Sequence, residues 1–173
     1  MQRRQFIFHT SALAGVFLMA GSKVIMAHPI NKSLDLAPLD KPHNEWKNLI
    51  SKQAFHILFE EGTERPDSSS LNNVKVDGTF ICAACYLPLF EFETKYDSGT
   101  GWPSFYQPIK GRIETKLDLK LVWPRTEYHC IRCMGHQGHV FEDGPEPTGL
   151  RYCNNGLALK FIPANKALPD LRG

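Results

Sequence analysis

The five cysteines are the residues of this chain whose type and spacing most directly indicate chemistry. Four of them form two C-x-x-C pairs, Cys82-Ala-Ala-Cys85 and Cys130-Ile-Arg-Cys133, and the fifth is Cys153. A C-x-x-C turn brings two thiolates close together, and a second such turn completes a tetrahedral sulfur site. Zinc suits four thiolates because it is redox-inert and accepts tetrahedral geometry. The spacing therefore predicts one structural zinc ion.

Three other interpretations of the paired cysteines stay open. A redox C-x-x-C of the thioredoxin type needs a βαβ context, and the sequence pattern does not provide one. Two local disulfides are also possible, but a shared metal ion explains better why the C-x-x-C motif occurs twice. His136 and His139 continue the every-third-residue series after Cys133, so either could replace a cysteine on the metal.

Once four cysteines are assigned to a metal, Cys153 is the one thiol left for chemistry. A lone cysteine is often an inert buried side chain. Arg151 stands two residues away, on the same side if this segment is a strand, and could stabilise a thiolate against the free-thiol pKa of about 8.5. Asn154 and Asn155 can donate hydrogen bonds. These neighbours favour a nucleophile.

Three longer motifs surround these residues and occur in a fixed order along the chain. They read Gly99-Thr-Gly-Trp-Pro-Ser-Phe105, His136-Gln-Gly-His-Val-Phe-Glu-Asp-Gly-Pro145 and Pro147-Thr-Gly-Leu-Arg-Tyr-Cys-Asn-Asn155. Together with both C-x-x-C pairs and Gly62-Thr-Glu64, they resemble the methionine sulfoxide reductase B family from roughly residue 45 to 163. The resemblance implies a mainly antiparallel β fold with two sheets in a zinc-stapled, tent-like arrangement. It also implies reduction of the R epimer of methionine sulfoxide, free or in peptides, as protein repair under oxidative stress.

The resemblance assigns a role to each matching residue. Cys153 is the implied nucleophile, which attacks the sulfoxide sulfur while an imidazole delivers a proton to the oxygen, leaving a sulfenic acid. Trp102 would pack against the substrate methyl group. The supporting polar residues are His136, His139, Asp143, Arg151 and Asn155. Taken singly, these residues have plainer interpretations: Trp102 with Phe105 as core, the histidines as structural, Asp143 as a turn former and Arg151 as a surface ion-pair partner.

Position 100 departs from the pattern of many family members. Those members carry there a second cysteine that resolves the sulfenic acid as an internal disulfide, whereas this chain has Thr100. Regeneration is therefore expected from an external thiol, either a small molecule or a thioredoxin-like protein. Gln137 is a second departure, at a site that is commonly apolar.

The elements that must position these residues can be outlined from periodicity. Apolar residues at helical spacing over 44–61 predict two short, core-facing N-terminal helices, with Ser51 capping the second and Gly62 ending them. The run 62–70 has loop composition. Short β-like segments follow between Gly, Pro, Asp and Asn residues, at 78–82, 117–122, 128–130, 139–141 and 157–161. This pattern independently favours antiparallel β structure.

The N-terminal part of the chain has the composition of an export signal. Arg3-Arg4 precede Phe6 and an apolar stretch too short to span a bilayer, which resembles a twin-arginine signal with cleavage after Ala27. A retained membrane anchor is the alternative. We therefore expect a signal over 1–27, a linker over 28–43, a reductase domain over 44–165, a tail over 166–173 and a periplasmic location. No membrane span is expected once the signal is removed.

The charge balance bears on which partners the chain can bind. Three of the 20 basic residues and none of the 18 acidic ones lie in the first 27 residues, so the remainder is close to neutral. This gives no broad electrostatic reason to bind nucleic acid. Two competing functions stay open: a zinc-ribbon binding module with an inert Cys153, and a one-cysteine thiol peroxidase. Epimer-specific turnover of methionine sulfoxide would separate all three.

Overall fold

The computed structural model describes residues 36–120 and 123–173, so the expected signal over 1–27 and residues 28–35 of the expected linker lie outside the described residues. The helical elements are η1 (His43–Asn48), α1 (Lys52–Glu60), η2 (Ser70–Asn73), η3 (Phe92–Thr94) and η4 (Gly156–Ala158), where η marks a 3-10 helix. The strands are β1 (Gly78–Cys82), β2 (Pro88–Glu91), β3 (Lys95–Tyr96), β4 (Ser104–Phe105), β5 (Ile113–Asp118), β6 (Arg125–Cys130), β7 (His136–Phe141), β8 (Arg151–Asn154) and β9 (Leu159–Pro163).

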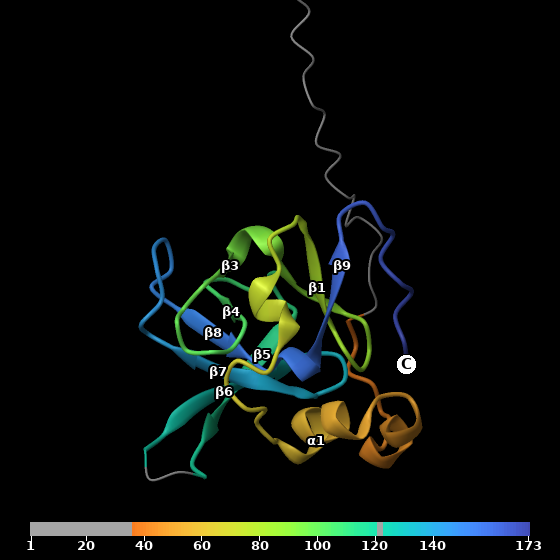
Figure 1. The fold of residues 1–173 in the computed structure, drawn as a ribbon. Coiled ribbons are helices and arrows are strands. Elements are labelled where there is room, and N and C mark those ends of the chain that lie inside the picture. The colour runs from red at the N-terminus through yellow and green to blue at the C-terminus, as the bar shows by residue number, and fades with distance from the viewer. Residues whose placement is uncertain (1–35, 121–122) are drawn as a thin grey trace, which may run out of the picture. The chain divides into compact units, whose positions relative to one another are not determined.

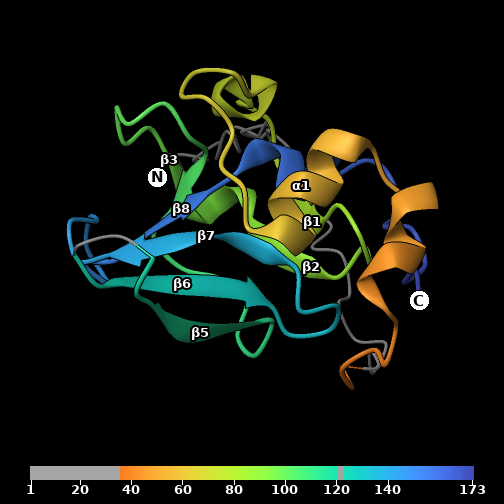
Figure 2. The ribbon, with the colours of Figure 1, turned by 90° about the horizontal axis from the view of Figure 1, so that it is seen from below.

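These strands form two antiparallel sheets, as the family resemblance implied. One sheet has the order β2-β1-β9, and the other has the order β3-β4-β8-β7-β6-β5. Figure 1 shows β1 and β9 beside the wider sheet, with helix α1 below them, and Figure 2 shows β5, β6 and β7 side by side at its edge. The last strand of the chain, β9, pairs with β1 near the start of the domain. All strands of the wider sheet, β3 to β8, therefore lie between β2 and β9 in the sequence.

An aromatic layer joins the two sheets. Phe90 of β2 stacks on Phe105 of β4 with ring centroids 4.2 Å apart, and Phe80 of β1 meets the same ring edge-on at 4.9 Å. Tyr128 of β6 and Tyr152 of β8 continue the layer at 5.4 Å. Burying an aromatic side chain of this size stabilises a fold by roughly 1.5–3 kcal/mol. This layer is the core on which the wider sheet rests.

The N-terminal helices match the expected pair. The Ser51 hydroxyl caps α1 by accepting a hydrogen bond from the Ala54 amide at 3.1 Å, as predicted. The buried face of α1 includes Ile57 and Leu58. Two details were wrong: the left-handed residue that ends α1 is Glu61 rather than Gly62, and Leu49 is 43% exposed instead of core-facing.

The expected strands differ in accuracy. The segment 78–82 coincides with β1, while 128–130 and 139–141 fall inside β6 and β7. Of the expected strand over 117–122, residues 117 and 118 end β5, which begins earlier than expected, at Ile113. Leu119 and Lys120 lie outside that strand, and residues 121 and 122 lie outside the described residues. In the expected strand over 157–161, the first two residues belong to η4 and only the rest to β9.

The part of the expected linker that the structure describes contacts the domain. The Leu39 amide donates a hydrogen bond to the Arg132 carbonyl oxygen at 2.7 Å, and Leu36 packs against the core. Among the described residues, no helix has the length and apolar character needed to cross a bilayer.

Candidate metal and thiol site

The four paired cysteines come together as one cluster. The sulfur atoms of Cys82, Cys85, Cys130 and Cys133 all lie within 4.8 Å of one another, and all four residues are buried. The nearest sulfurs belong to different pairs, with Cys82 at 3.6 Å from Cys133 and Cys85 at 3.5 Å from Cys130. A disulfide needs about 2.05 Å, whereas four sulfurs bound to zinc at 2.3 Å stand about 3.8 Å apart. The geometry therefore fits a tetrahedral metal and not two local disulfides.

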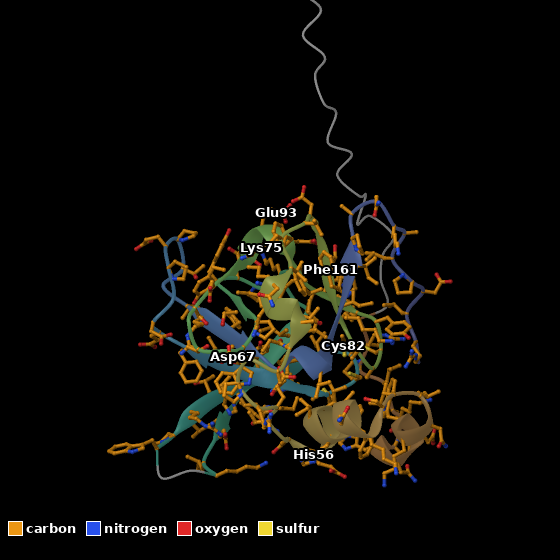
Figure 3. The ribbon with its side chains drawn as sticks, viewed as in Figure 1. His56, Asp67, Lys75, Cys82, Glu93 and Phe161 are labelled. Atoms are coloured by element: carbon orange, nitrogen blue, oxygen red, sulfur yellow. The ribbon has the colours of Figure 1, made fainter. Side chains whose placement is uncertain are left out.

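The cluster connects the two sheets. Cys82, labelled in Figure 3, is the last residue of β1, where it pairs with Leu159 of β9. Cys130 is the last residue of β6. Each sheet thus supplies one C-x-x-C turn. The two histidines that could have replaced a cysteine are bound to carboxylates elsewhere, as described below, so the cluster holds four sulfur donors.

Cys153 lies on β8 within a row of side chains that crosses the wider sheet. The register places it directly opposite His139 of β7 and Ser104 of β4. His139 in turn is opposite Glu127 of β6, and Glu127 is opposite Lys116 of β5. Directly opposed residues of antiparallel strands project from the same face with Cβ atoms about 4.5–5.5 Å apart. The thiol and one predicted histidine are therefore neighbours.

The surroundings of Cys153 act on its thiol in opposite directions. Burial raises the pKa of the Cys153 thiol, and the Arg151 charge, with hydrogen bonds from the Thr100 and Arg151 side chains, lowers it. Burial prevails, so the pKa lies above its ordinary value. Arg151 does favour the thiolate, as the sequence indicated, but it does not outweigh desolvation.

A register shift in β7 places the second histidine on the same face as the first. In a regular strand, residues three apart point to opposite faces. Between Tyr128 and His129 of β6 the pairing with β7 shifts by one residue, which makes Gln137 an extra residue in β7. The ring of His136 consequently lies 5.4 Å from that of His139, centroid to centroid.

Each of the two histidines is hydrogen-bonded to a carboxylate that the sequence did not single out. His136 Nδ1 lies 2.8 Å from Glu127 Oε1, and His139 Nε2 lies 2.8 Å from Asp118 Oδ2. Both carboxyl side chains are more than nine-tenths buried. Their partners are set by strand register across β5, β6 and β7, which a single sequence does not supply.

Asp143 and Arg151, predicted as supporting residues, form a bidentate ion pair. Arg151 Nε and a terminal guanidinium nitrogen each donate to Asp143 at 2.8 Å, and the guanidinium lies over the Phe141 ring. The hydrogen bonds from Arg151 hold the pKa of Asp143 below its usual value. The pair fixes Arg151 beside Cys153.

Trp102 and Asn155 are held by the loop that follows α1. Trp102 Nε1 donates to the Glu64 carbonyl oxygen at 3.2 Å, and the Glu64 amide donates to Asn155 Oδ1 at 3.0 Å. Trp102 is partly exposed, while Phe105 is fully buried, so only Phe105 belongs to the core. The Asn155 side-chain amide also donates to the Gln137 carbonyl oxygen at 3.0 Å. Both ends of that amide therefore bind the backbone, which makes Asn155 a clamp between segments.

Thr100 stands at the thiol, where its side chain hydrogen-bonds to Cys153. Its hydroxyl contacts that of Ser98 at 2.8 Å, and the Ser98 hydroxyl contacts that of Ser104 at 2.7 Å. Since Ser104 is opposite Cys153, this chain of hydroxyl groups runs along one side of the thiol. It supplies hydrogen-bond donors beside the thiol.

Comparison with known proteins agrees with this architecture. The SelR domain model matches residues 50–163. Peptide methionine sulfoxide reductase B1, chloroplastic, of Arabidopsis thaliana is 50% identical over 124 residues, which are 71% of this chain and 61% of that protein. The MsrB proteins of Methanosarcina barkeri and Pseudomonas fluorescens are 48% and 44% identical, over 71% and 72% of this chain and 87% and 97% of their own lengths.

The matched region spans 61% of the length of the Arabidopsis relative and 55% of its rice counterpart, so these plant proteins have additional residues outside it. The SelR match over residues 50–163 includes both C-x-x-C pairs and every residue of the row on the wider sheet, from Lys116 to Ser104. The chain belongs to the SelR domain family, the family of the peptide methionine sulfoxide reductases B.

Proposed function

We propose that this protein reduces the R epimer of methionine sulfoxide, with Cys153 as the nucleophile. The observation that carries the proposal is the direct cross-strand pairing of Cys153 with His139, which puts a proton-transferring group next to the thiol. The family membership supports the same reaction, because relatives of this chain are named for it.

The reaction begins as a transfer of oxygen from one sulfur to another. The Cys153 sulfur attacks the sulfoxide sulfur, the thiol proton reaches the sulfoxide oxygen through an imidazole, and the oxygen passes to Cys153. Thiol and sulfoxide thus become sulfenic acid and thioether, with atoms and electrons balanced. The raised pKa of Cys153 fits this course, because the thiol still carries the proton that the oxygen needs.

An external thiol would complete the cycle. Its sulfur displaces water from the Cys153 sulfenic acid, and a second thiol releases the mixed disulfide. Cys153 is the one cysteine outside the four-cysteine cluster, so the chain holds no other free thiol for this step. A small thiol or a thioredoxin-like protein fits this requirement. The four-cysteine cluster would hold one structural zinc ion, for which its sulfur spacing is suited.

The first 27 residues support export to the periplasm through a twin-arginine signal, because Arg3-Arg4 precede a short apolar stretch. Fractionation of cells that produce the wild type and the Arg3→Lys, Arg4→Lys variant tests this. The wild type is expected in the periplasm and the variant in the cytoplasm; equal distribution of the two would contradict export by this signal.

Turnover of separate epimers tests the reaction. Purified protein and its Cys153→Ser variant are incubated with the R or the S epimer of an N-acetylated methionine sulfoxide and with dithiothreitol. We expect methionine from the R epimer alone and none from the variant. Turnover that survives in Cys153→Ser, or that does not distinguish the epimers, would refute the proposal and favour the binding module or the thiol peroxidase.

A further inference from the structure

Two buried carboxylates stand behind His136 and His139, each in contact with a cation as well. Glu127, whose side chain is 4% exposed, contacts His136 at 2.8 Å and Lys116 at 3.0 Å. Asp118, whose side chain is 7% exposed, contacts His139 at 2.8 Å and Arg125 at 2.6 Å. The two histidines use different ring nitrogens for these bonds, Nδ1 in His136 and Nε2 in His139.

Both carboxyl groups stay ionised at neutral pH. Burial by itself would raise the pKa of Glu127, but hydrogen bonds from His136 and Lys116 outweigh it and lower that pKa. The pKa of Asp118 is lowered by the Lys120 backbone amide first, and by His139 and Arg125 in addition. An ionised carboxylate can only accept hydrogen bonds. The nitrogen that faces it must therefore carry the proton.

We propose, on the basis of the function above, that Glu127 and Asp118 are positioning residues that hold the two imidazoles in opposite tautomers, with His136 protonated on Nδ1 and His139 on Nε2. His136 Nε2 and His139 Nδ1 then remain as proton acceptors, and within the described residues neither has a hydrogen-bond partner. An acceptor beside Cys153 can take up the thiol proton and return it to the sulfoxide oxygen. In the opposite tautomer, His136 Nε2 or His139 Nδ1 would already carry a hydrogen, so that nitrogen could not accept the thiol proton.

The tautomers can be read directly from the wild-type protein. Long-range ¹H–¹⁵N spectra of the histidine rings distinguish the two neutral forms, and His136→Gln and His139→Gln variants assign the signals. We expect Nδ1 protonation for His136 and Nε2 protonation for His139. The reverse tautomer at either ring would overturn the proposal, whether or not the protein reduces methionine sulfoxide.

Isosteric variants test the consequence for catalysis. Glu127→Gln and Asp118→Asn keep the shape but can donate a hydrogen bond, so each should admit the other tautomer at its histidine. We expect kcat to fall about tenfold or more with KM changed less than twofold, together with the new tautomer in the spectra. Glu114→Gln is the matched control, since this exposed β5 carboxylate forms its ion pair, at 3.8 Å, with His129 rather than with His136 or His139. It should retain wild-type kcat and tautomers.

The two proposals fail in different ways. If the wild type does not turn over either epimer, the function is wrong while the tautomers still stand or fall by the spectra. If the wild type is active and Glu127→Gln and Asp118→Asn keep full kcat, the positioning role is wrong and the function stands. Should a variant not fold, as judged by its circular dichroism, the wild-type spectra alone decide.

Discussion

At the scale of single residues, Cys153 combines a position directly opposite His139 with a raised thiol pKa. Burial opposes the thiolate, while Arg151 and Thr100 favour it. The sequence showed Arg151 two positions away but not how deeply the thiol is buried, so the sign of the shift could not be predicted from it. The pairing of Asp143 with Arg151 could be expected from their charges, and the carboxylates behind the histidines could not.

Alkylation of Cys153 as a function of pH tests the direction of this shift. A raised pKa lowers the thiolate fraction at any given pH, so the rate with iodoacetamide should rise through a midpoint above the ordinary value of about 8.5. Arg151→Met removes a charge that favours the thiolate and should move the midpoint higher still. Cys153→Ser should show no reaction at this site. A midpoint below the ordinary value in the wild type would contradict the burial argument.

Restoring a second sulfur tests the account of regeneration. Because the Thr100 side chain hydrogen-bonds to Cys153, a sulfur at position 100 lies within reach of the sulfenic acid. After one turnover with substrate, Thr100→Cys should show an intrachain disulfide between positions 100 and 153 by mass spectrometry. Ser98→Cys, one hydroxyl farther along, is the control and should form none. Equal disulfide in both variants would contradict the placement of Thr100.

At the scale of elements, strand β7 carries the features that bring the histidines to the thiol. Its extra residue, Gln137, aligns His136 with His139, and Gly138 lets the backbone of β8 approach closely. The sequence motif indicated a role for both histidines. Because two residues separate them, however, a regular strand would place their side chains on opposite faces. Only the pairing with β6 reveals the shift.

Replacement of Gly138 tests how closely β7 and β8 must approach. A Cβ at this position would lie 1.9 Å from the Cys153 carbonyl oxygen, which is fixed backbone. Gly138→Ala should lower the free energy of unfolding by about 2–3 kcal/mol, measured by urea denaturation, and should reduce turnover. Gly111→Ala is the control, because its φ of +71° costs about 1 kcal/mol without any clash. A Gly138→Ala protein as stable as the wild type would show that the strands can separate there.

Helices and strands were predicted correctly from the sequence where the local sequence signals were strong. The Ser51 cap and the apolar spacing after it sufficed for α1, and Gly78 to Cys82 sufficed for β1. Strand β5 was misplaced because its exposed middle residues carry little apolar alternation, whereas the apolar run after it attracts a strand assignment. The very short β4 forms by pairing with β8, and β3 forms by pairing with β4, so neither strand has more than a weak signal of its own in the sequence.

At the scale of the whole molecule, the four-cysteine cluster and the aromatic layer connect the two sheets at separate places. The two C-x-x-C turns come from different sheets, and the rings of Phe90 and Phe105 stack between them. The doubled cysteine motif allowed the cluster to be predicted from spacing. The pairs of aromatic rings that meet across the sheets depend on long-range packing, so they could not be predicted from the sequence.

Removal of the proposed zinc ion tests the connection at the four-cysteine cluster. Without an ion, four crowded thiols would be buried with nothing to neutralise their negative form, so chelation or Cys85→Ser should lower the free energy of unfolding by several kcal/mol. Metal content and thermal unfolding are measured together, and re-addition of zinc to the chelated protein should restore both. Cys153→Ser should retain its metal and its stability. A metal-free protein that unfolds at the wild-type temperature would contradict a structural role.

The alternation of side chains along β8 ties correct folding to reactivity. Tyr152 and Asn154 reach inward, to the Tyr128 ring and hydroxyl, while Cys153 between them belongs to the outward row. A strand misaligned by one step would turn the tyrosine out to solvent and hide the sulfur in the aromatic layer. Such a molecule would lose its packing and its chemistry together, so a partly refolded sample should contain inactive, loosely packed chains but no well-packed inactive population.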